Sequence, residues 1–163
     1  SRPGAGGILG AARMSGILLR PATPADYDAI AAIWHRSAGL PGVGPVRLPS
    51  LEQLRARIDV EIEAGWLVTV AVAGEEIIGF LALKPEAAIL DQLFMHPDAR
   101  GLGLGLLLLD EAKAQLPDGF TLFTRTGNTP ARRFYEKHGL SHLRDELHPV
   151  FGDPIVWYGW KQG

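Results

Sequence analysis

The sequence has 163 residues, the size of one ordinary domain, and contains no cysteine, which excludes disulfides, thiolate metal sites and a cysteine nucleophile. Its formal net charge is -2 with dispersed Lys and Arg, whereas nucleic-acid-binding proteins carry a basic stripe. No apolar run approaches the ~18 residues that span a bilayer. We therefore expect a cytoplasmic protein that binds neither nucleic acid nor membrane.

The N-terminal residues differ in composition from the rest of the chain. Residues 1–13 are rich in Gly and Ala, show no period, and lack the apolar stretch of a signal peptide. Met14 followed by Ser15 and Gly16 resembles a natural start. We interpret residues 1–13 as a disordered extension or cloning remnant, and residues 14–163 as a single domain.

The first half of the domain predicts a strand followed by two helices. Residues 17–20 form the strand, which Pro21 ends. The helices are separated by a Gly- and Pro-rich loop at 39–49, and the second begins after the N-cap Ser50 and ends at Gly65. The apolar residues that recur at helical spacing are Ile30, Ile33 and Trp34 in the first helix and Leu51, Leu54, Ile58 and Ile62 in the second.

The second half predicts a three-strand meander and then alternating helices and strands. The strands are 66–73, 77–83, 88–95 and 120–125 with two more within 140–160, and the helices are 104–116 and 129–138. The single strand–helix–strand crossover makes 88–95 and 120–125 parallel neighbours in a mostly antiparallel α+β sheet. A ligand would enter at this parallel pair.

A glycine-rich segment joins strand 88–95 to the apolar helix that follows it. Gly101, Gly103 and Gly105 alternate there and leave room for a ligand near the free N–H groups of the first helical turn. The helix dipole adds about half a positive charge, and Arg100 adds a full one. The segment therefore predicts a pyrophosphate cradle. Its spacing differs from the G-x-G-x-x-G dinucleotide fingerprint, and the Gly-Lys-Ser/Thr of a Walker loop is absent.

Two motifs resemble those of a known family. Residues 100–105 match the Q/R-x-x-G-x-G/A signature of the GNAT superfamily of N-acetyltransferases, and residues 91–97 look like that family's fourth strand. Residues 128–140 are similar to its second signature, N-x-x-A-x-x-F-Y-E-K-x-G-F, with Leu140 in place of the usual aromatic residue. The resemblance extends from Leu19 to Trp160. It implies an α+β fold with a mixed, mostly antiparallel sheet of about seven strands and about four helices.

The resemblance also implies a cofactor site. In the family, acetyl-CoA lies in a V-shaped gap between the fourth and fifth strands, and its pantetheine pairs with backbone, here that of 93–95. A backbone N–H near Phe94 or Met95 would polarise the thioester carbonyl. The cofactor-binding residues implied are Leu93, Phe94, Met95, Arg100, Gly101, Leu102, Gly103, Leu104, Gly105, Asn128, Ala131, Phe134 and Tyr135.

Catalytic roles follow from the same resemblance. Tyr135 matches the family's frequent general acid, which protonates the leaving thiolate; its alternative role is a wall aromatic. Glu86 or Asp91 is the expected base, and ordered water, His35 or His96 are alternatives. Asn128 is also an ordinary N-cap candidate. No metal is expected, since the histidines lack metal-ligand spacing.

The sequence predicts an N-acetyltransferase that moves an acetyl group from acetyl-CoA to a primary amine of a small molecule or protein by direct attack. The alternatives are a non-catalytic acyl-CoA-binding sensor domain of the same fold and a nucleotide-phosphate binder. The acceptor is not identified, loop 39–49 is long enough to be its lid, and a homodimer is compatible with the sequence. Candidate walls for the acceptor, each also a candidate core residue, are Tyr27, Trp34, His35, Trp157 and Tyr158.

Overall fold

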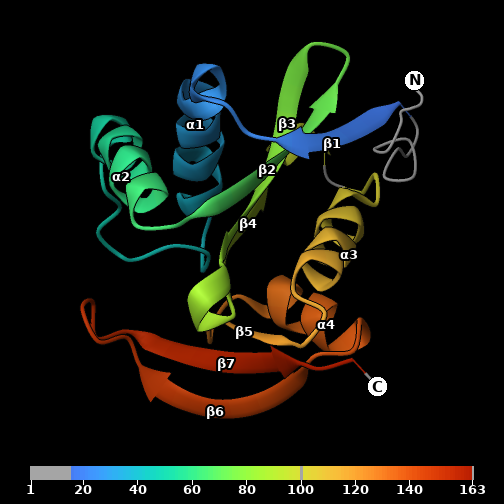
Figure 1. The fold of residues 1–163 in the computed structure, drawn as a ribbon. Coiled ribbons are helices and arrows are strands. Elements are labelled where there is room, and N and C mark those ends of the chain that lie inside the picture. The colour runs from blue at the N-terminus through green and yellow to red at the C-terminus, as the bar shows by residue number, and fades with distance from the viewer. Residues whose placement is uncertain (1–15, 100, 163) are drawn as a thin grey trace.

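The fold is a seven-stranded mixed sheet with two helices on each face (Figure 1). The computed structural model describes residues 16–99 and 101–162, so the predictions for residues 1–13 and for Arg100 lie outside the described residues. The strand order is β1-β2-β3-β4-β5-β7-β6. The elements are β1 Ile17–Pro21, α1 Tyr27–Ala38, α2 Leu51–Glu63, β2 Leu67–Ala73, β3 Glu76–Lys84, β4 Ile89–Met95, α3 Leu104–Gln115, β5 Phe120–Arg125, α4 Thr129–Lys137, β6 Ser141–Leu147 and β7 Pro154–Trp160.

The central strands are buried on both faces, and two separate cores result. In β3, Phe80 belongs to the core under α1 and α2, whereas its neighbour Leu81 belongs to the core under α3 and α4. This alternation follows the period of two of a strand. Each core is closed by fully buried helix residues, among them Ile30 and Ile58 on one face and Leu108 on the other.

Helix α2 begins where the sequence predicts it. The Ser50 hydroxyl accepts the Gln53 N–H at 3.1 Å, and the Gln53 side chain accepts the Ser50 N–H at 2.8 Å. This capping box satisfies two of the backbone donors that a helix start leaves free. The helix therefore stays in register, with Leu54 and Ile58 buried against the sheet.

Strands β4 and β5 are parallel neighbours as predicted, but they pair only briefly. Their single register pair among the described residues is Ile89 with Thr121, next to a hydrogen bond from the Thr121 N–H to the Ala88 carbonyl at 3.0 Å. Towards their carboxyl ends the strands separate, and Figure 1 shows β5 and β7 turning away below β4. The sheet therefore contains a V-shaped gap at this point.

A β-bulge lies on the other side of β4. Ala82 pairs with Gln92 and Leu83 with Leu90, so Asp91 is an extra residue in β4. A bulge bends a strand and increases its local twist. It therefore helps to turn the carboxyl half of β4 away from β5.

A buried ion pair ties β1 to the start of α1. Two Arg20 nitrogens donate to the two Asp26 carboxylate oxygens at 2.7 and 2.9 Å, and the Thr23 N–H donates to the same carboxylate at 2.8 Å. The Arg20 hydrogen bond is the main cause that lowers the pKa of Asp26 to about 2, against an opposing contribution from burial.

We expect this pair to make stability depend on acid pH. The Asp26 pKa is lower in the folded protein than its ordinary 3.8, so the carboxylate stabilises the fold above that pH and the contribution is lost as the pH falls towards 2. Asp26→Asn should therefore lower the free energy of unfolding by about 2 kcal/mol at pH 6 and by much less at pH 2.5. Urea unfolding of both proteins at both pH values measures this difference. An equal loss of unfolding free energy at the two pH values would contradict the prediction.

Candidate active site

The glycine segment forms an open helix N-terminus. Gly101 and Gly103 have φ of 82° and 78°, in the left-handed region that favours glycine. Gly103 is the N-cap of α3 and makes no side-chain cap, and the first helical hydrogen bond runs from the Leu107 N–H to the Gly103 carbonyl at 3.1 Å. The N–H groups of residues 103–106 therefore have no partner within the helix and are available to an anion.

Gly105 is required for a different reason. A Cβ there would lie 3.2 Å from Met95 Cε and 3.4 Å from Phe134 Cζ. Glycine thus lets α3 approach β4 and α4 closely. Of the two leucines between the glycines, Leu102 is exposed, whereas the Leu104 side chain is buried and leaves only its backbone for a ligand.

The register of β4 decides which backbone groups face the gap. The His96 N–H donates to the Ile78 carbonyl at 2.7 Å, and residues opposite each other in an antiparallel pair alternate between bonded and non-bonded pairs. The Phe94 N–H consequently points to β3, while the N–H groups of Leu93 and Met95 point towards β5. Of the two oxyanion donors that the sequence offered, only Met95 faces the gap, and Leu93 is a further donor nearer the bulge. The Met95 carbonyl accepts the Ser37 hydroxyl at 3.0 Å.

Helix α4 brings the second motif to the same gap. The Asn128 side chain caps α4 by accepting the Ala131 N–H at 3.3 Å, and its amide donates to Thr124 at 3.3 Å. Its capping role is therefore present, and its role towards a cofactor stays a prediction. Ala131 and Phe134 pack against the core under α3 and α4, beside Met95 and Leu93.

Tyr135 is buried among aromatic rings. Its ring centroid lies 5.4 Å from that of Phe134 and 6.1 Å from that of Tyr158. Burial raises the pKa of Tyr135 to about 12, and among the described residues no group forms a hydrogen bond with its hydroxyl. The phenol is therefore protonated at neutral pH and has its proton free to donate.

The two candidate bases differ in position. Asp91 lies in the bulge, where it accepts the Trp66 indole N–H at 2.9 Å and lies 3.8 Å from the Lys84 ammonium. Glu86 is exposed in the turn before β4, at the end of the strand opposite the gap mouth. The geometry therefore favours Asp91 over Glu86, and both roles stay predictions.

Part of the sheet has no helix over it on the α1 and α2 side. Leu122 and Val156 face the core under α3 and α4, so their neighbours Phe123 and Trp157 project to the other face, where their rings lie 5.3 Å apart. Trp157 therefore lies outside both cores, and its role as an acceptor wall stays a prediction. The predicted walls Tyr27, Trp34 and Tyr158 are instead core residues, and the Tyr158 hydroxyl donates to Glu136 at 2.6 Å.

The turn between β6 and β7 is organised around His148. Its Nδ1 accepts the N–H groups of Val150 and Phe151, both at 3.1 Å. Burial lowers the pKa of His148, and the Arg125 guanidinium lowers it further, against an opposing contribution from Asp153. The imidazole is therefore held by the backbone of its own turn.

Loop 39–49 runs from the end of α1 to the turn that follows β5. A Cβ on Gly42 would lie 3.1 Å from the Gly127 carbonyl oxygen in that turn. Gly44 packs back on the end of α1, where a Cβ would collide with the Ala38 carbonyl oxygen. The loop thus lies beside the carboxyl end of β5, and its role as a lid stays a prediction.

Comparison with known proteins agrees with this fold. The profile of the Acetyltransferase (GNAT) family matches residues 32–140. The chain therefore belongs to the GNAT acetyltransferase family, whose acyl donor is acetyl-CoA. The expected mixed sheet of seven strands and four helices is confirmed.

The matches with individual curated relatives cover only part of each relative's length. The chain is 40% identical over 65 residues to the peptidyl-lysine N-acetyltransferase YjaB of Salmonella typhimurium, covering 40% of this chain and 43% of that protein. It is 29% identical over 122 residues to the mycothiol acetyltransferase of Thermobispora bispora, covering 75% of this chain and 40% of that protein. The chain thus spans less than half the length of either curated relative.

A solved structure shares the fold at low sequence identity. Salmonella typhimurium yncA, solved with its cofactor acetyl-CoA, superposes with a TM-score of 0.67 over 90% of this chain and 94% of that one, at 16% identity.

Within residues 16–99 and 101–162, no helix is long and apolar enough to cross a membrane. In the same residues, no three His, Asp or Glu side chains come together as a metal site would require.

We expect a negatively charged side chain at position 103 to weaken CoA binding strongly. Gly103→Ala and Gly103→Glu share the strain of a left-handed residue, about 1 kcal/mol, but only Glu places a carboxylate at the proposed pyrophosphate site. Gly103→Glu should lose CoA affinity at least tenfold relative to Gly103→Ala. Calorimetric titration of both folded variants measures this ratio, and equal affinities would show that the phosphates bind elsewhere.

Proposed function

We propose that this protein is an N-acetyltransferase that transfers the acetyl group of acetyl-CoA to a primary amine by direct attack. The observation that carries the proposal is the gap between β4 and β5, whose mouth ends at the uncapped N-terminus of α3. A pyrophosphate on residues 103–106 and a pantetheine arm along β4 would place the thioester deep in the gap. The arm would then pair with the backbone that β5 leaves free.

The bulge at Asp91 supports a specific position for the reacting carbonyl. Leu93 lies two residues after the bulge, and its N–H faces the gap with β5 turned away. A backbone donor fixed by the sheet needs no reorganisation when charge develops on an oxygen. We assign the Leu93 N–H as the oxyanion donor and the Met95 N–H as a pantetheine contact.

The reaction needs only these groups and a neutral amine. The amine lone pair forms a bond to the thioester carbonyl carbon, and the carbonyl electrons move to the oxygen held by the Leu93 N–H. The tetrahedral intermediate then expels the CoA thiolate, and the ammonium proton passes to a base or to water. Asp91 is the better-placed base candidate, because it lies in β4 on the face that α1 and α2 cover.

Tyr135 fits the leaving group as a hydrogen-bond donor. The Tyr135 phenol, with a pKa of about 12, remains protonated at neutral pH, whereas the ordinary pKa of a thiol is about 8.5. Complete proton transfer from the phenol to the thiolate is therefore unfavourable by about 5 kcal/mol in the ligand-free protein. The phenol can still stabilise the thiolate by donating a hydrogen bond as negative charge develops on sulfur.

The relatives support an amine acceptor, and catalysis is favoured over sensing. A peptidyl-lysine N-acetyltransferase acts, by its name, on a primary amine, which is the group that the direct mechanism requires. A non-catalytic sensor of acyl-CoA would need the phosphate cradle but would not need a protonated phenol to stabilise a leaving thiolate. Tyr135 is therefore the feature that favours turnover.

Acetyl-CoA and an amine panel test this function directly. CoA at about 100 times its dissociation constant should stabilise the protein by about 2.7 kcal/mol, which a thermal shift assay detects. Free thiol should appear from acetyl-CoA only when an amine is present, with acetylated amine found by mass spectrometry in equal amount. Binding of CoA without transfer to any metabolite or peptide amine would favour the sensor function over the transferase function. The absence of a thermal shift would reject both functions.

We expect Tyr135→Phe to lower turnover while binding is preserved. The substitution removes only the hydroxyl, so acetyl-CoA affinity should stay within about twofold, and kcat should fall by about 10 to 100-fold. Because the pKa is raised to about 12, the proton is present throughout the ordinary range, so the loss should be the same from pH 6 to pH 10. Steady-state kinetics across that range provide the measurement. Wild-type turnover in the Phe variant would return Tyr135 to a packing role.

A further inference from the structure

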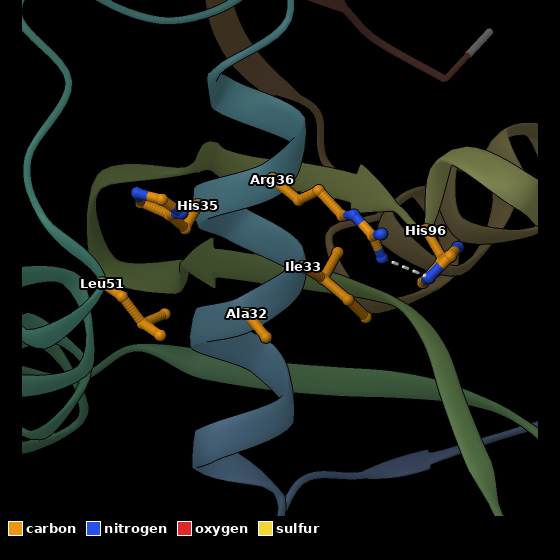
Figure 2. Close-up of a pocket in the computed structure, with 6 residues that line it drawn as sticks. All are labelled: Ala32, Ile33, His35, Arg36, Leu51 and His96. Atoms are coloured by element: carbon orange, nitrogen blue, oxygen red, sulfur yellow. Dashed lines mark hydrogen bonds between the residues drawn. The ribbon is translucent and has the colours of Figure 1, made fainter.

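A shallow pocket lies on the outer side of α1, next to the end of β4. Its volume is about 280 Å³. Figure 2 shows Arg36 extending from α1 towards His96, with Ile33 beside them and with His35 and Leu51 on the other side of the helix. The residues that line it are Ala32, Ile33, His35, Arg36, Leu51 and His96.

The pocket lining is basic at one end and apolar at the other. Arg36 and two histidines supply every ionisable group, and Ala32, Ile33 and Leu51 supply the apolar contacts. Among the described residues no carboxylate lies within ion-pair distance of Arg36, and the one near His96 is the exposed Asp98, 3.7 Å from Nδ1. The pocket therefore suits a ligand that combines an anionic group with an apolar body.

The His96 ring lies between two hydrogen-bond donors. Its Nδ1 lies 3.1 Å from the Asp98 backbone nitrogen, and its Nε2 lies 2.8 Å from an Arg36 guanidinium nitrogen. A neutral imidazole accepts at only one of its two nitrogens, so one of these two donors has no acceptor on the ring. An oxygen ligand can supply the missing acceptor, and when His96 donates from Nε2 the same ligand can accept from Arg36 and His96 together.

We propose that Arg36 and His96 bind a carboxylate of the amine acceptor, which makes Arg36 a specificity-determining residue. This inference rests on the proposed function, because it names the substrate class of the same enzyme: amines that carry a carboxylate, either on the amine compound itself or on a residue beside the acetylated lysine of a peptide. Planar guanidinium groups recognise carboxylates with two parallel hydrogen bonds.

The position of the pocket assigns it to the acceptor and not to the cofactor phosphates. His96 directly follows β4, and Ser37, next to Arg36, donates its hydroxyl to the Met95 carbonyl at the gap mouth. The proposed phosphate cradle belongs to α3, which packs on the opposite face of the sheet from α1 (Figure 1). An acceptor that approaches from the side of α1 therefore passes Arg36 before it reaches the thioester.

Paired acceptors that differ in one carboxylate test the inference. His96 lies three residues beyond Leu93, about 10 Å along the strand, so the acceptor needs an amine and a carboxylate that are far apart. 6-Aminohexanoate is therefore compared with 6-aminohexanamide, and a lysine peptide with Glu beside the lysine is compared with the same peptide carrying Gln. In the wild type, kcat/KM should favour the carboxylate member of at least one pair by about tenfold. In Arg36→Gln the preference should fall to within about twofold through a higher KM for the carboxylate member.

The control variant is Arg133→Gln, which removes an exposed arginine of α4 on the other face of the sheet. It should keep the wild-type preference. The acceptor pair whose two members differ in kcat/KM shows whether the recognised carboxylate belongs to a small amine or to a peptide. Equal kcat/KM within both pairs, or a preference that Arg36→Gln leaves intact, would overturn the inference. Weaker CoA binding in Arg36→Gln, with acceptor preference retained, would also overturn it by assigning Arg36 to the cofactor.

A binding measurement separates this inference from the proposed function. 6-Acetamidohexanoate should shift the imidazole NMR signals of His96 in the wild type, and 6-acetamidohexanamide should not. Arg36→Gln should remove the difference. If no amine is acetylated but this discrimination is seen, the transferase function fails and the carboxylate site stands. If acetyl transfer occurs and neither assay discriminates, the carboxylate site fails and the transferase function stands.

Discussion

The interruption of pairing between β4 and β5 is the constraint on which the site depends. A sheet that continued through these strands would bury the backbone of Leu93 and Met95 in ladder hydrogen bonds. Here one register pair joins the two halves, and the carboxyl ends remain unpaired. Unpaired backbone donors inside a protein are costly unless a partner arrives, so the same geometry that weakens the sheet prepares it for a ligand.

Much of the fold was predictable because local signals and packing agree. The N-cap Ser50, Gly65 after the second helix, and the helical spacing of Ile30, Ile33 and Trp34 each predicted an element that the structure contains. The parallel relation of β4 and β5 followed from the crossover through α3. The family resemblance implied a gap between these strands, but the residue at which their pairing stops and the bulge at Asp91 have no local signal, because both depend on register with other strands.

The candidate site likewise has one part that the sequence could predict and one part that it could not. The glycine cradle and α4 carry local motifs, so the sequence predicted which residues gather there. Arg36 with His96 and Ser37 with Met95 join segments about 60 residues apart, and no spacing within either segment indicates the other. For Tyr158 the sequence left two roles open, a wall for the acceptor and a core residue, and the structure assigns it to the core, where it is fully buried.

The contact between loop 39–49 and the turn after β5 has a mechanical consequence. The two halves of the sheet share the core under α3 and α4, but between the strands themselves they meet at one parallel pair and, beyond it, at the approach of Gly42 to Gly127. A molecule that pairs with the free backbone of β4 would add a connection made of its own amide groups. We therefore expect a bound molecule to make the two halves of the sheet move more nearly as one rigid body.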